Sequence, residues 1–249
     1  MPVRPFVVGN WKMNGLSTGL QEAAEVARAL AAEPARARVA ICPPATLIHR
    51  LSLQMKGTAV EVGAQDCHAE PCGAYTGDVC ADMLADAGAR LVILGHSERR
   101  EGHRETDAHV AAKVEAALGA GLEPIVCVGE SLEERRAGNA AAVVRRQVEG
   151  SLPKALAGKT FSVAYEPIWA IGSGLTPTEV EIEAVHRDIR AALRGLFADQ
   201  AAETPILYGG SVKPGNARTI LAVPEVDGAL VGGASLTARE FLPIVRAAG

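Results

Sequence analysis

The sequence has few aromatic side chains and no long hydrophobic run. Phe, Trp and Tyr make up 4% of its 249 residues, although 48% of the residues are hydrophobic. The core must therefore be built mainly from aliphatic side chains and alanine. No apolar run reaches the ~20 residues that a membrane-spanning helix needs. The N-terminus has no signal-peptide core or cleavage site, so we expect a cytoplasmic protein that is not embedded in a membrane.

Positive charge and cysteine are also scarce. The formal net charge of −4 argues against binding to nucleic acid or to an anionic membrane, which requires clustered Lys and Arg. The five cysteines are an odd number without a secretion signal, so we expect reduced thiols. Those within residues 67–80 lack the spacing of a zinc knuckle, and no metal is expected there. Cys42 and Cys127 lie in apolar runs and are expected in the core.

Eight short apolar runs recur along the chain, each followed by a polar or glycine-bearing loop and then by helical spacing. Continuous apolar character is typical of parallel strands that are buried on both faces. The runs are Phe6–Gly9, Val39–Cys42, Val60–Ala64, Leu91–Leu94, Pro124–Val128, Phe161–Tyr165, Pro205–Tyr208 and Gly228–Val231.

Eight such units without a linker predict one α/β domain over residues 1–249, and the length fits a closed (β/α)8 barrel. An open doubly wound sheet is the alternative. That fold requires a Gly-x-Gly-x-x-Gly turn after its first strand, and Gly9-Asn10-Trp11-Lys12 does not provide it.

Helical patterns lie between the runs. Leu20–Ala32 and Thr106–Leu118 have the spacing of amphipathic helices. A further helix is expected to begin with Thr176 as its N-cap, Pro177 as its first residue and Glu179 closing the capping box. Its apolar stripe is expected to contain Val180, Ile182, Val185 and Ile189.

Residues suited to catalysis or ligand binding gather just after the apolar runs. In a barrel the carboxyl ends of the strands meet on one face, where enzymes with this architecture have their sites. We therefore expect these residues to form one site: Asn10, Lys12, Gln65, His96, Glu98, Glu166, Ser211, Gly232 and Gly233.

Glu166 directly follows the sixth run. Pro167 stops regular strand pairing, and bulky apolar residues and the segment Gly172-Ser173-Gly174 follow. A carboxylate at the mouth of a strand under a hinged apolar cover is suited to act as a desolvated general base. The alternative is an ordinary connection between a strand and a helix.

Two glycine turns indicate a phosphate site. Gly209-Gly210-Ser211 and Gly232-Gly233-Ala234-Ser235 each follow a late strand. Glycine lets backbone N–H groups approach an anion, and the last two loops of a barrel commonly bind phosphate. The implied ligand is a small phosphate ester, for which Gly172 could add another N–H group.

The remaining residues indicate the reaction type. Lys12 is placed to stabilise negative charge, with Asn10 orienting it and Glu98 holding its ammonium group. No nucleophile paired with a base and no dinucleotide fingerprint is present. The set favours proton abstraction next to a carbonyl, with the enediolate oxygen stabilised by His96, Lys12 and Asn10. The other histidines are expected to be solvated; they lie at positions 49, 68, 103, 109 and 186.

Taken together, these motifs resemble those of the triosephosphate isomerase family, in content, order and spacing, from about Phe6 to Leu236. The matching segments are Asn10–Lys12, Gly63–Gln65, Gly73–Gly77, Gly95–Arg100, Tyr165–Gly172, Tyr208–Val212 and Val231–Leu236.

The resemblance implies a TIM barrel that interconverts dihydroxyacetone phosphate and glyceraldehyde 3-phosphate in glycolysis and gluconeogenesis, without a cofactor. It assigns Glu166 as the base and His96 as a neutral electrophile, a pair of roles for which this family is itself a well-known example of acid–base tuning. Asn10 and Lys12 would bind substrate, and the lid would run from Pro167 to about Thr176. The phosphate would be held by Gly172, Ser211, Gly232 and Gly233, with Glu98, Gln65 and Thr76 in supporting roles.

The resemblance also implies a homodimer. The third loop, here Asp66–Asp78, would enter the partner subunit and carry Thr76 towards the partner's site. Its small and apolar residues favour an interface over a solvated excursion. Two other functions stay open: another phosphate-binding barrel isomerase of sugar phosphates, and a non-catalytic barrel that binds phosphate esters.

Overall fold

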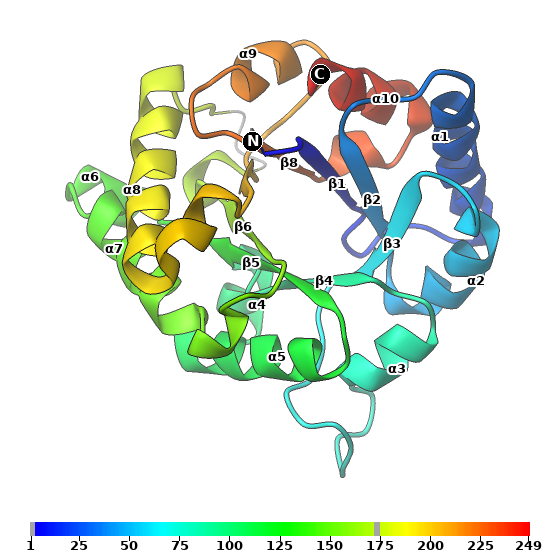
Figure 1. The fold of residues 1–249 in the computed structure, drawn as a ribbon, viewed down its shortest axis with the longest axis horizontal. Coiled ribbons are helices and arrows are strands. Elements are labelled where there is room, and N and C mark those ends of the chain that lie inside the picture. Colours follow the sequence, from blue (N-terminus) through cyan, green and yellow to red (C-terminus); the bar gives the residue numbers. More distant parts are fainter. Residues whose placement is uncertain (1–2, 172–174) are drawn as a thin grey trace.

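Eight parallel strands close into a barrel that helices surround (Figure 1). The computed structural model describes residues 3–171 and 175–249. Each strand pairs with the next along the chain, and β8 pairs back with β1. This confirms the predicted closed barrel. The strands are β1 Phe6–Asn10, β2 Arg38–Cys42, β3 Val60–Ala64, β4 Leu91–Leu94, β5 Glu123–Val128, β6 Ser162–Tyr165, β7 Ile206–Tyr208 and β8 Gly228–Val231.

Ten α-helices and five 3₁₀ turns lie in the described parts of the chain. None of these helices combines the length and the apolar character needed to cross a bilayer. The α-helices are α1 Leu20–Ala32, α2 Ala45–Met55, α3 Ala81–Asp86, α4 Ser97–Gly102, α5 Asp107–Gly119, α6 Leu132–Arg136, α7 Ala140–Ser151, α8 Glu179–Phe197, α9 Ala217–Leu221 and α10 Ala238–Ala247. The 3₁₀ turns are η1 Ser17–Gly19, η2 Lys154–Leu156, η3 Ile168–Ala170, η4 Ala198–Ala202 and η5 Gly233–Ser235.

Strand side chains alternate between the barrel interior and the surrounding helices. Both directions are buried, which explains why the strand sequences are continuously apolar. A large cluster packs the outer face of the strands against the helices. A second, separate cluster fills the interior: Phe6, Val8, Ala40, Cys42, Leu91, Ile93, Ile125, Cys127, Ala164, Leu207 and Leu230. Cys42 and Cys127 are thus core residues, as expected.

An ion-paired layer closes the amino-terminal end of the barrel. Arg38 contacts Glu61 at 2.6 Å and Glu123 at 2.7 Å, and its guanidinium lies over the Phe6 ring. Arg38 and Glu123 are also the first residues of β2 and β5, one position before the predicted apolar runs. These two strands begin earlier than the apolar pattern because the partly buried charges are paired. Arg38 on β2 contacts Glu61 on the adjacent β3 and Glu123 on β5, which is not a neighbour of β2.

The start of α8 differs from the prediction. Thr178, not Thr176, is the N-cap, and its backbone N–H donates to Glu181 Oε2 at 2.7 Å. The sequence contains two overlapping Thr-x-x-Glu boxes, and the later box gains an ion pair between Glu181 and Arg135 at 2.9 Å. The helix therefore begins two residues later than predicted. Within the expected stripe, Val180 is 75% exposed, whereas Ile182, Val185 and Ile189 are buried.

His186 is fully buried, so the prediction that it is solvated was wrong. Its Nδ1 lies 2.9 Å from the carbonyl oxygen of Glu225, and its ring packs between Tyr165 and Tyr208. Its position on α8 falls on the buried stripe, four residues after Ile182, which outweighs the polar character of the neighbouring residues. Burial lowers the pKa of His186 to about 4.

This burial predicts a pH-dependent loss of stability. An unfolded histidine titrates near 6.5, so between pH 6.5 and 4 the unfolded chain binds more protons than the folded chain. Acidification across this window should remove about 3 kcal/mol of the unfolding free energy through His186. Urea unfolding of the His186→Gln variant should show a flatter pH dependence there than the wild type.

The exposed His49 offers a matched control. The His49→Gln variant should keep the pH slope of the wild type. Equal slopes for His186→Gln and wild type would contradict the assignment of the titration to His186.

Candidate active site

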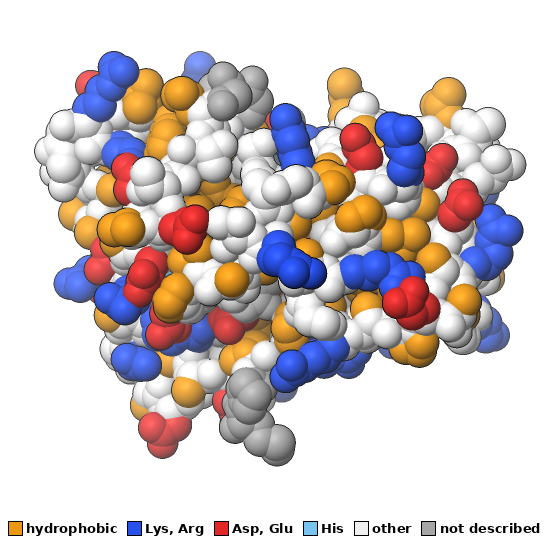
Figure 2. Space-filling view, turned by 90° about the horizontal axis from the view of Figure 1, so that it is seen from above, with side chains coloured by type: hydrophobic (Ala, Val, Ile, Leu, Met, Phe, Trp, Pro, Cys, Tyr) orange, Lys and Arg blue, Asp and Glu red, His pale blue; other side chains and the backbone are white. Residues whose placement is uncertain are grey.

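A cleft of about 570 Å³ lies over the carboxyl ends of the strands. Figure 2 views the molecule at 90° to Figure 1, and basic, acidic and apolar side chains are interspersed there. Because the net charge of −4 does not attract an anion, local groups must recognise an anionic ligand. The lining includes Asn10, Trp11, Lys12, His96, Glu166, Ile171, Gly209, Gly210, Ser211, Lys213, Gly232 and Gly233.

The inward-facing rows of the strands deliver two of these side chains. Asn10 follows Phe6 and Val8 on the inward side of β1, and Glu166 follows Ala164 on the inward side of β6. Alternation therefore makes both side chains project into the mouth of the barrel. Both are buried: Asn10 is 5% exposed and Glu166 is 2% exposed.

Lys12 is held in a left-handed backbone conformation with φ 53°. Its N–H donates to Asn10 Oδ1 at 3.0 Å, and its carbonyl accepts from Gln65 Nε2 at 2.9 Å. Its ammonium group lies 2.6 Å from Glu98 Oε1. Glu98 is largely exposed, so this pair adds little stability, but it orients the ammonium group at the edge of the cleft.

His96 forms the N-cap of α4 through its ring. Its Nδ1 accepts a hydrogen bond from Glu98 N at 3.2 Å, which requires a lone pair on that nitrogen. A proton on Nε2 then gives a neutral imidazole. Nε2 lies 2.8 Å from Glu166 Oε1 and is placed to donate to it. The helix end thus selects the tautomer that presents an N–H to the cleft.

Glu166 is bound on both oxygens. Besides the contact with His96, its Oε2 accepts from Ser97 N at 2.9 Å, at the first turn of α4. Burial opposes ionisation, but His96, Ser97 and the nearby Lys12 outweigh it, so the pKa of the Glu166 carboxyl lies below its ordinary value. The group is therefore a carboxylate at neutral pH.

Small residues make room for this carboxylate. A Cβ atom at Gly209 would come within 2.9 Å of Glu166 Cγ. Cys127 lies behind Glu166, and burial raises the pKa of its thiol, so the sulfur is protonated and adds no charge. Any larger residue at position 209 would displace the Glu166 side chain.

The two glycine turns follow the neighbouring strands β7 and β8. Ser211, Gly232 and Gly233 all line the cleft. A Cβ atom at Gly210 would lie 2.2 Å from Tyr208 Oη, so only glycine fits in that turn. Gly172, the fourth predicted phosphate contact, lies outside the described residues.

Thr76 is not brought into the site of its own chain. It is exposed on the loop Asp66–Asp78 and does not line the cleft. A second cavity of about 510 Å³ shares Asn10, Lys12 and His96 with the cleft and extends beside the base of this loop. Gln65 and Glu98 line this second cavity, one tying the backbone of Lys12 and the other its ammonium group.

Sequence reasoning missed two residues that shape the site. Ser97 supplies the backbone N–H that holds Glu166, and its only signal is its place at the first position of a helix after a strand. Trp11 donates its indole N–H to the Ser235 carbonyl at 3.0 Å, a contact between residues far apart in the sequence. In the described parts of the chain, no three His, Cys, Asp or Glu side chains are grouped as a metal ion would require.

Comparisons with known proteins agree with this geometry. The family model described as triosephosphate isomerase matches residues 5–248. A protein named triosephosphate isomerase from Caulobacter vibrioides is 62% identical to this chain, over 98% of this chain and 96% of its own length. A second protein of that name, from Afipia carboxidovorans, is 54% identical, over 98% of this chain and 98% of its own length. The crystal structure of triosephosphate isomerase from Bartonella henselae superimposes with a TM-score of 0.92 at 44% identity, covering 98% of this chain and 99% of that one. The chain belongs to the triosephosphate isomerase family.

Proposed function

We propose that this chain interconverts dihydroxyacetone phosphate and glyceraldehyde 3-phosphate by proton transfer through an enediolate. One observation carries the proposal. A buried carboxylate, a neutral imidazole N–H and an ammonium group line one cleft together with two glycine turns. Cβ atoms at Gly209 and Gly232 would lie 2.9 Å from Glu166 Cγ and 3.4 Å from Lys12 Cε, so proton-transfer groups and anion-binding turns are within reach of one small phosphorylated triose.

The proposed chemistry divides between the glycine turns and the proton-transfer groups. Backbone N–H groups at Ser211, Gly232 and Gly233 hold the phosphate. The carbonyl and hydroxyl oxygens lie between His96 and Lys12, which stabilise the negative charge that develops on them. Glu166 removes a proton from one carbon and returns it to the next. His96 Nε2–H gives its proton to the former carbonyl oxygen and recovers one from the hydroxyl, so both groups are restored after each turnover.

Glu166 has to change its contacts before it acts. Its oxygens are engaged by His96 Nε2 and Ser97 N. We infer that the substrate oxygen takes over the Nε2–H group of His96. That exchange removes one of the interactions that hold the carboxylate and frees it to turn towards the substrate carbon.

The described part of the proposed lid begins directly after Glu166. It includes η3, and Trp169 Nε1 in this turn donates to the buried Glu130 Oε1 at 2.9 Å. The backbone N–H of Ile168 donates to Glu130 O at 3.2 Å. A cover that excludes water would protect the enediolate from losing phosphate.

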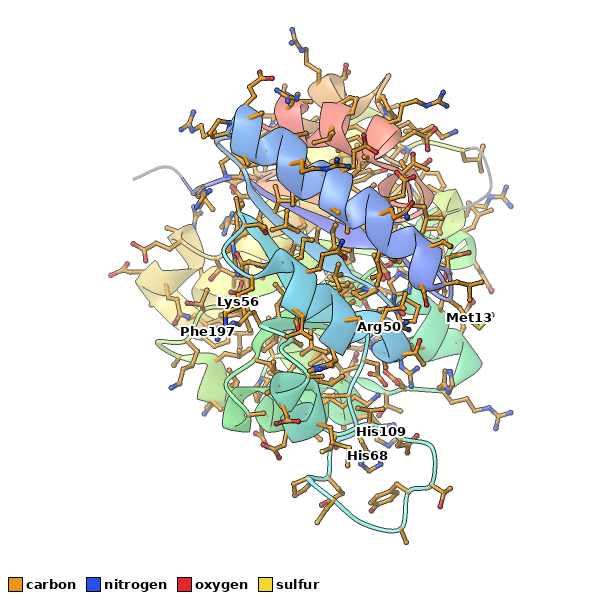
Figure 3. The ribbon with its side chains drawn as sticks, turned by 90° about the vertical axis from the view of Figure 1, so that its right-hand side faces the viewer. Met13, Arg50, Lys56, His68, His109 and Phe197 are labelled. Atoms are coloured by element: carbon orange, nitrogen blue, oxygen red, sulfur yellow. The ribbon has the colours of Figure 1, made fainter. Side chains whose placement is uncertain are left out.

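We further propose a homodimer that forms through Asp66–Asp78. Residues 70–78 are all exposed, and the loop projects from the barrel with His68 at its base (Figure 3). The base is rigid: Asp66 contacts Lys113 at 2.7 Å and Arg99 at 2.8 Å. A fixed base with an exposed, partly apolar tip is suited to enter a cavity of a second copy.

Residues 1–249 are proposed to act as one cytoplasmic domain in glycolysis and gluconeogenesis. Pairing of β1 with β8 supports the single domain, because strands from both ends of the chain are needed to close the barrel. All five cysteines are free thiols, which suits a reducing compartment.

Replacing the proposed base tests its role. Glu166→Gln should lower kcat for glyceraldehyde 3-phosphate on the order of 10²–10⁴-fold, since the amide cannot accept the proton, and should leave the affinity for inorganic phosphate nearly unchanged. Glu166→Asp keeps the charge but withdraws it by about one methylene, and should give an intermediate kcat. A normal kcat in the Gln variant would refute the assignment.

If the wild type did not turn over this substrate, the isomerase proposal itself would fail, in favour of another sugar-phosphate isomerase or a non-catalytic binder.

Removing the ammonium group tests the second role. Lys12→Ala should raise KM for glyceraldehyde 3-phosphate at least about tenfold and also lower kcat, because Lys12 faces both the bound anion and the developing charge. Lys56→Ala removes an exposed lysine at the opposite end of α2 from the cleft and serves as the control. Steady-state kinetics measure both. Unchanged KM and kcat in Lys12→Ala would show that Lys12 is only a surface charge.

The dimer is tested by truncating an exposed aromatic side chain of the loop. Tyr75 is 46% exposed and packs on His68. If it is a buried anchor in the dimer, Tyr75→Ala should raise the dimer dissociation constant on the order of 30-fold. Analytical ultracentrifugation measures this. Leu196→Ala, an exposed apolar residue of α8, should have no effect. A wild type that stays monomeric at every concentration would exclude the dimer.

A further inference from the structure

We propose that Ser235 is a positioning residue for the phosphate end of the cleft. Its hydroxyl holds the peptide between Gly232 and Gly233 so that the Gly233 N–H group faces the ligand. The inference rests on the proposed function, because it assigns the glycine turns of the cleft to a phosphate. Ser235 itself is 3% exposed and does not line the cleft.

Two hydrogen bonds from Ser235 converge on one carbonyl. Its Oγ donates to Gly232 O at 2.7 Å, and its backbone N–H donates to the same oxygen at 2.8 Å. The carbonyl of Gly232 is thereby fixed on the buried side of the turn. A 3₁₀ turn alone would supply only the backbone bond, so the hydroxyl is an additional constraint.

The geometry of the peptide bond transmits this constraint. In a trans peptide the C=O and N–H groups point in opposite directions. Because the Gly232 carbonyl points to the buried Ser235, the Gly233 N–H points away from that serine. Gly233 lines the cleft, and a Cβ atom there would meet no heavy atom within 4 Å other than those of its chain neighbours, so the surroundings of this residue are open.

The backbone at this peptide needs such a restraint. Gly232 has φ −82° and ψ −116°, outside the main regions that residues with a side chain populate. Glycine can adopt many other conformations at little cost. Without a partner for its carbonyl, the turn would sample peptide orientations that point the N–H elsewhere.

Ser235 is also hydrogen-bonded to the segment that contains Lys12. Its carbonyl accepts the indole N–H of the buried Trp11 at 3.0 Å, and Trp11 directly precedes Lys12. A Cβ atom at Gly9 would lie 2.9 Å from Ser235 Cβ, so β1 leaves space for this serine. The phosphate turn is therefore held against β1 and against the segment just after it, which contains Trp11 and Lys12.

The test separates phosphate binding from proton transfer by using substrates with and without the phosphate. For Ser235→Ala, we expect kcat/KM for glyceraldehyde 3-phosphate to fall about fivefold or more, the usual worth of one neutral hydrogen bond. The inhibition constant of inorganic phosphate should rise by a similar factor. Proton exchange of unphosphorylated glyceraldehyde in deuterium oxide, followed by NMR, should stay within about twofold of the wild type.

Two further variants complete the experiment. Ser235→Cys nearly preserves the volume but donates poorly, so it should behave like Ser235→Ala. Ser162→Ala removes another fully buried serine hydroxyl, at the start of β6, which has no hydrogen-bond partner within the described parts of the chain. This control should match the wild type in all three assays.

The outcomes are distinct. Parallel losses with phosphorylated and unphosphorylated triose would overturn the proposal, because Ser235 would then serve the fold in general. Wild-type behaviour of Ser235→Ala or Ser235→Cys in the phosphate assays would overturn it as well. A wild type without any isomerase activity would instead count against the proposed function.

Discussion

Closure of the barrel is the constraint on which the site depends. Because β8 pairs with β1, the register of every strand fixes the height of its last inward-facing side chain. Asn10 and Glu166 lie at the same rim only because their strands are in register around the cylinder. A slip of one residue in β6 would turn Glu166 towards the helices. Catalytic geometry and strand pairing are therefore one property of this fold.

The ionisation of Glu166 depends on the N-terminus of α4, which follows β4 and reaches the same rim of the barrel. The carboxylate is buried, yet the N–H of Ser97 and the imidazole of His96 keep it ionised. His96 in turn is set in its neutral form by capping the same helix. A short helix of six residues thus holds both the proposed base and the proposed electrophile. It achieves this with backbone groups, which require no particular side chain at Ser97.

The sequence predicted the fold and most of the rim because burial on both faces leaves a readable pattern. Continuous apolar runs located all eight strands, and glycine turns located the proposed anion-binding residues. The hydrogen-bond partners of polar side chains were harder to predict from the sequence. The contacts of Ser97 with Glu166 and of Trp11 with Ser235 join segments that only the closed barrel brings together. His186 was predicted to be solvated because its sequence neighbours are polar, but its place on the buried stripe of α8 determines its burial. Thr176 was predicted as the N-cap of α8, but the overlapping box that begins at Thr178 forms instead.

The ion-paired layer around Arg38 has a consequence for how such a molecule can diversify. Its charges fasten strands β2, β3 and β5 at the end remote from the cleft. In the described residues, the loops at the mouth of the barrel take no part in the ion pairs of Arg38. Mutations in the mouth loops can change the reaction without breaking the ion pairs that join the strands. The stability of the barrel and the evolution of new activities therefore depend on opposite ends of the protein.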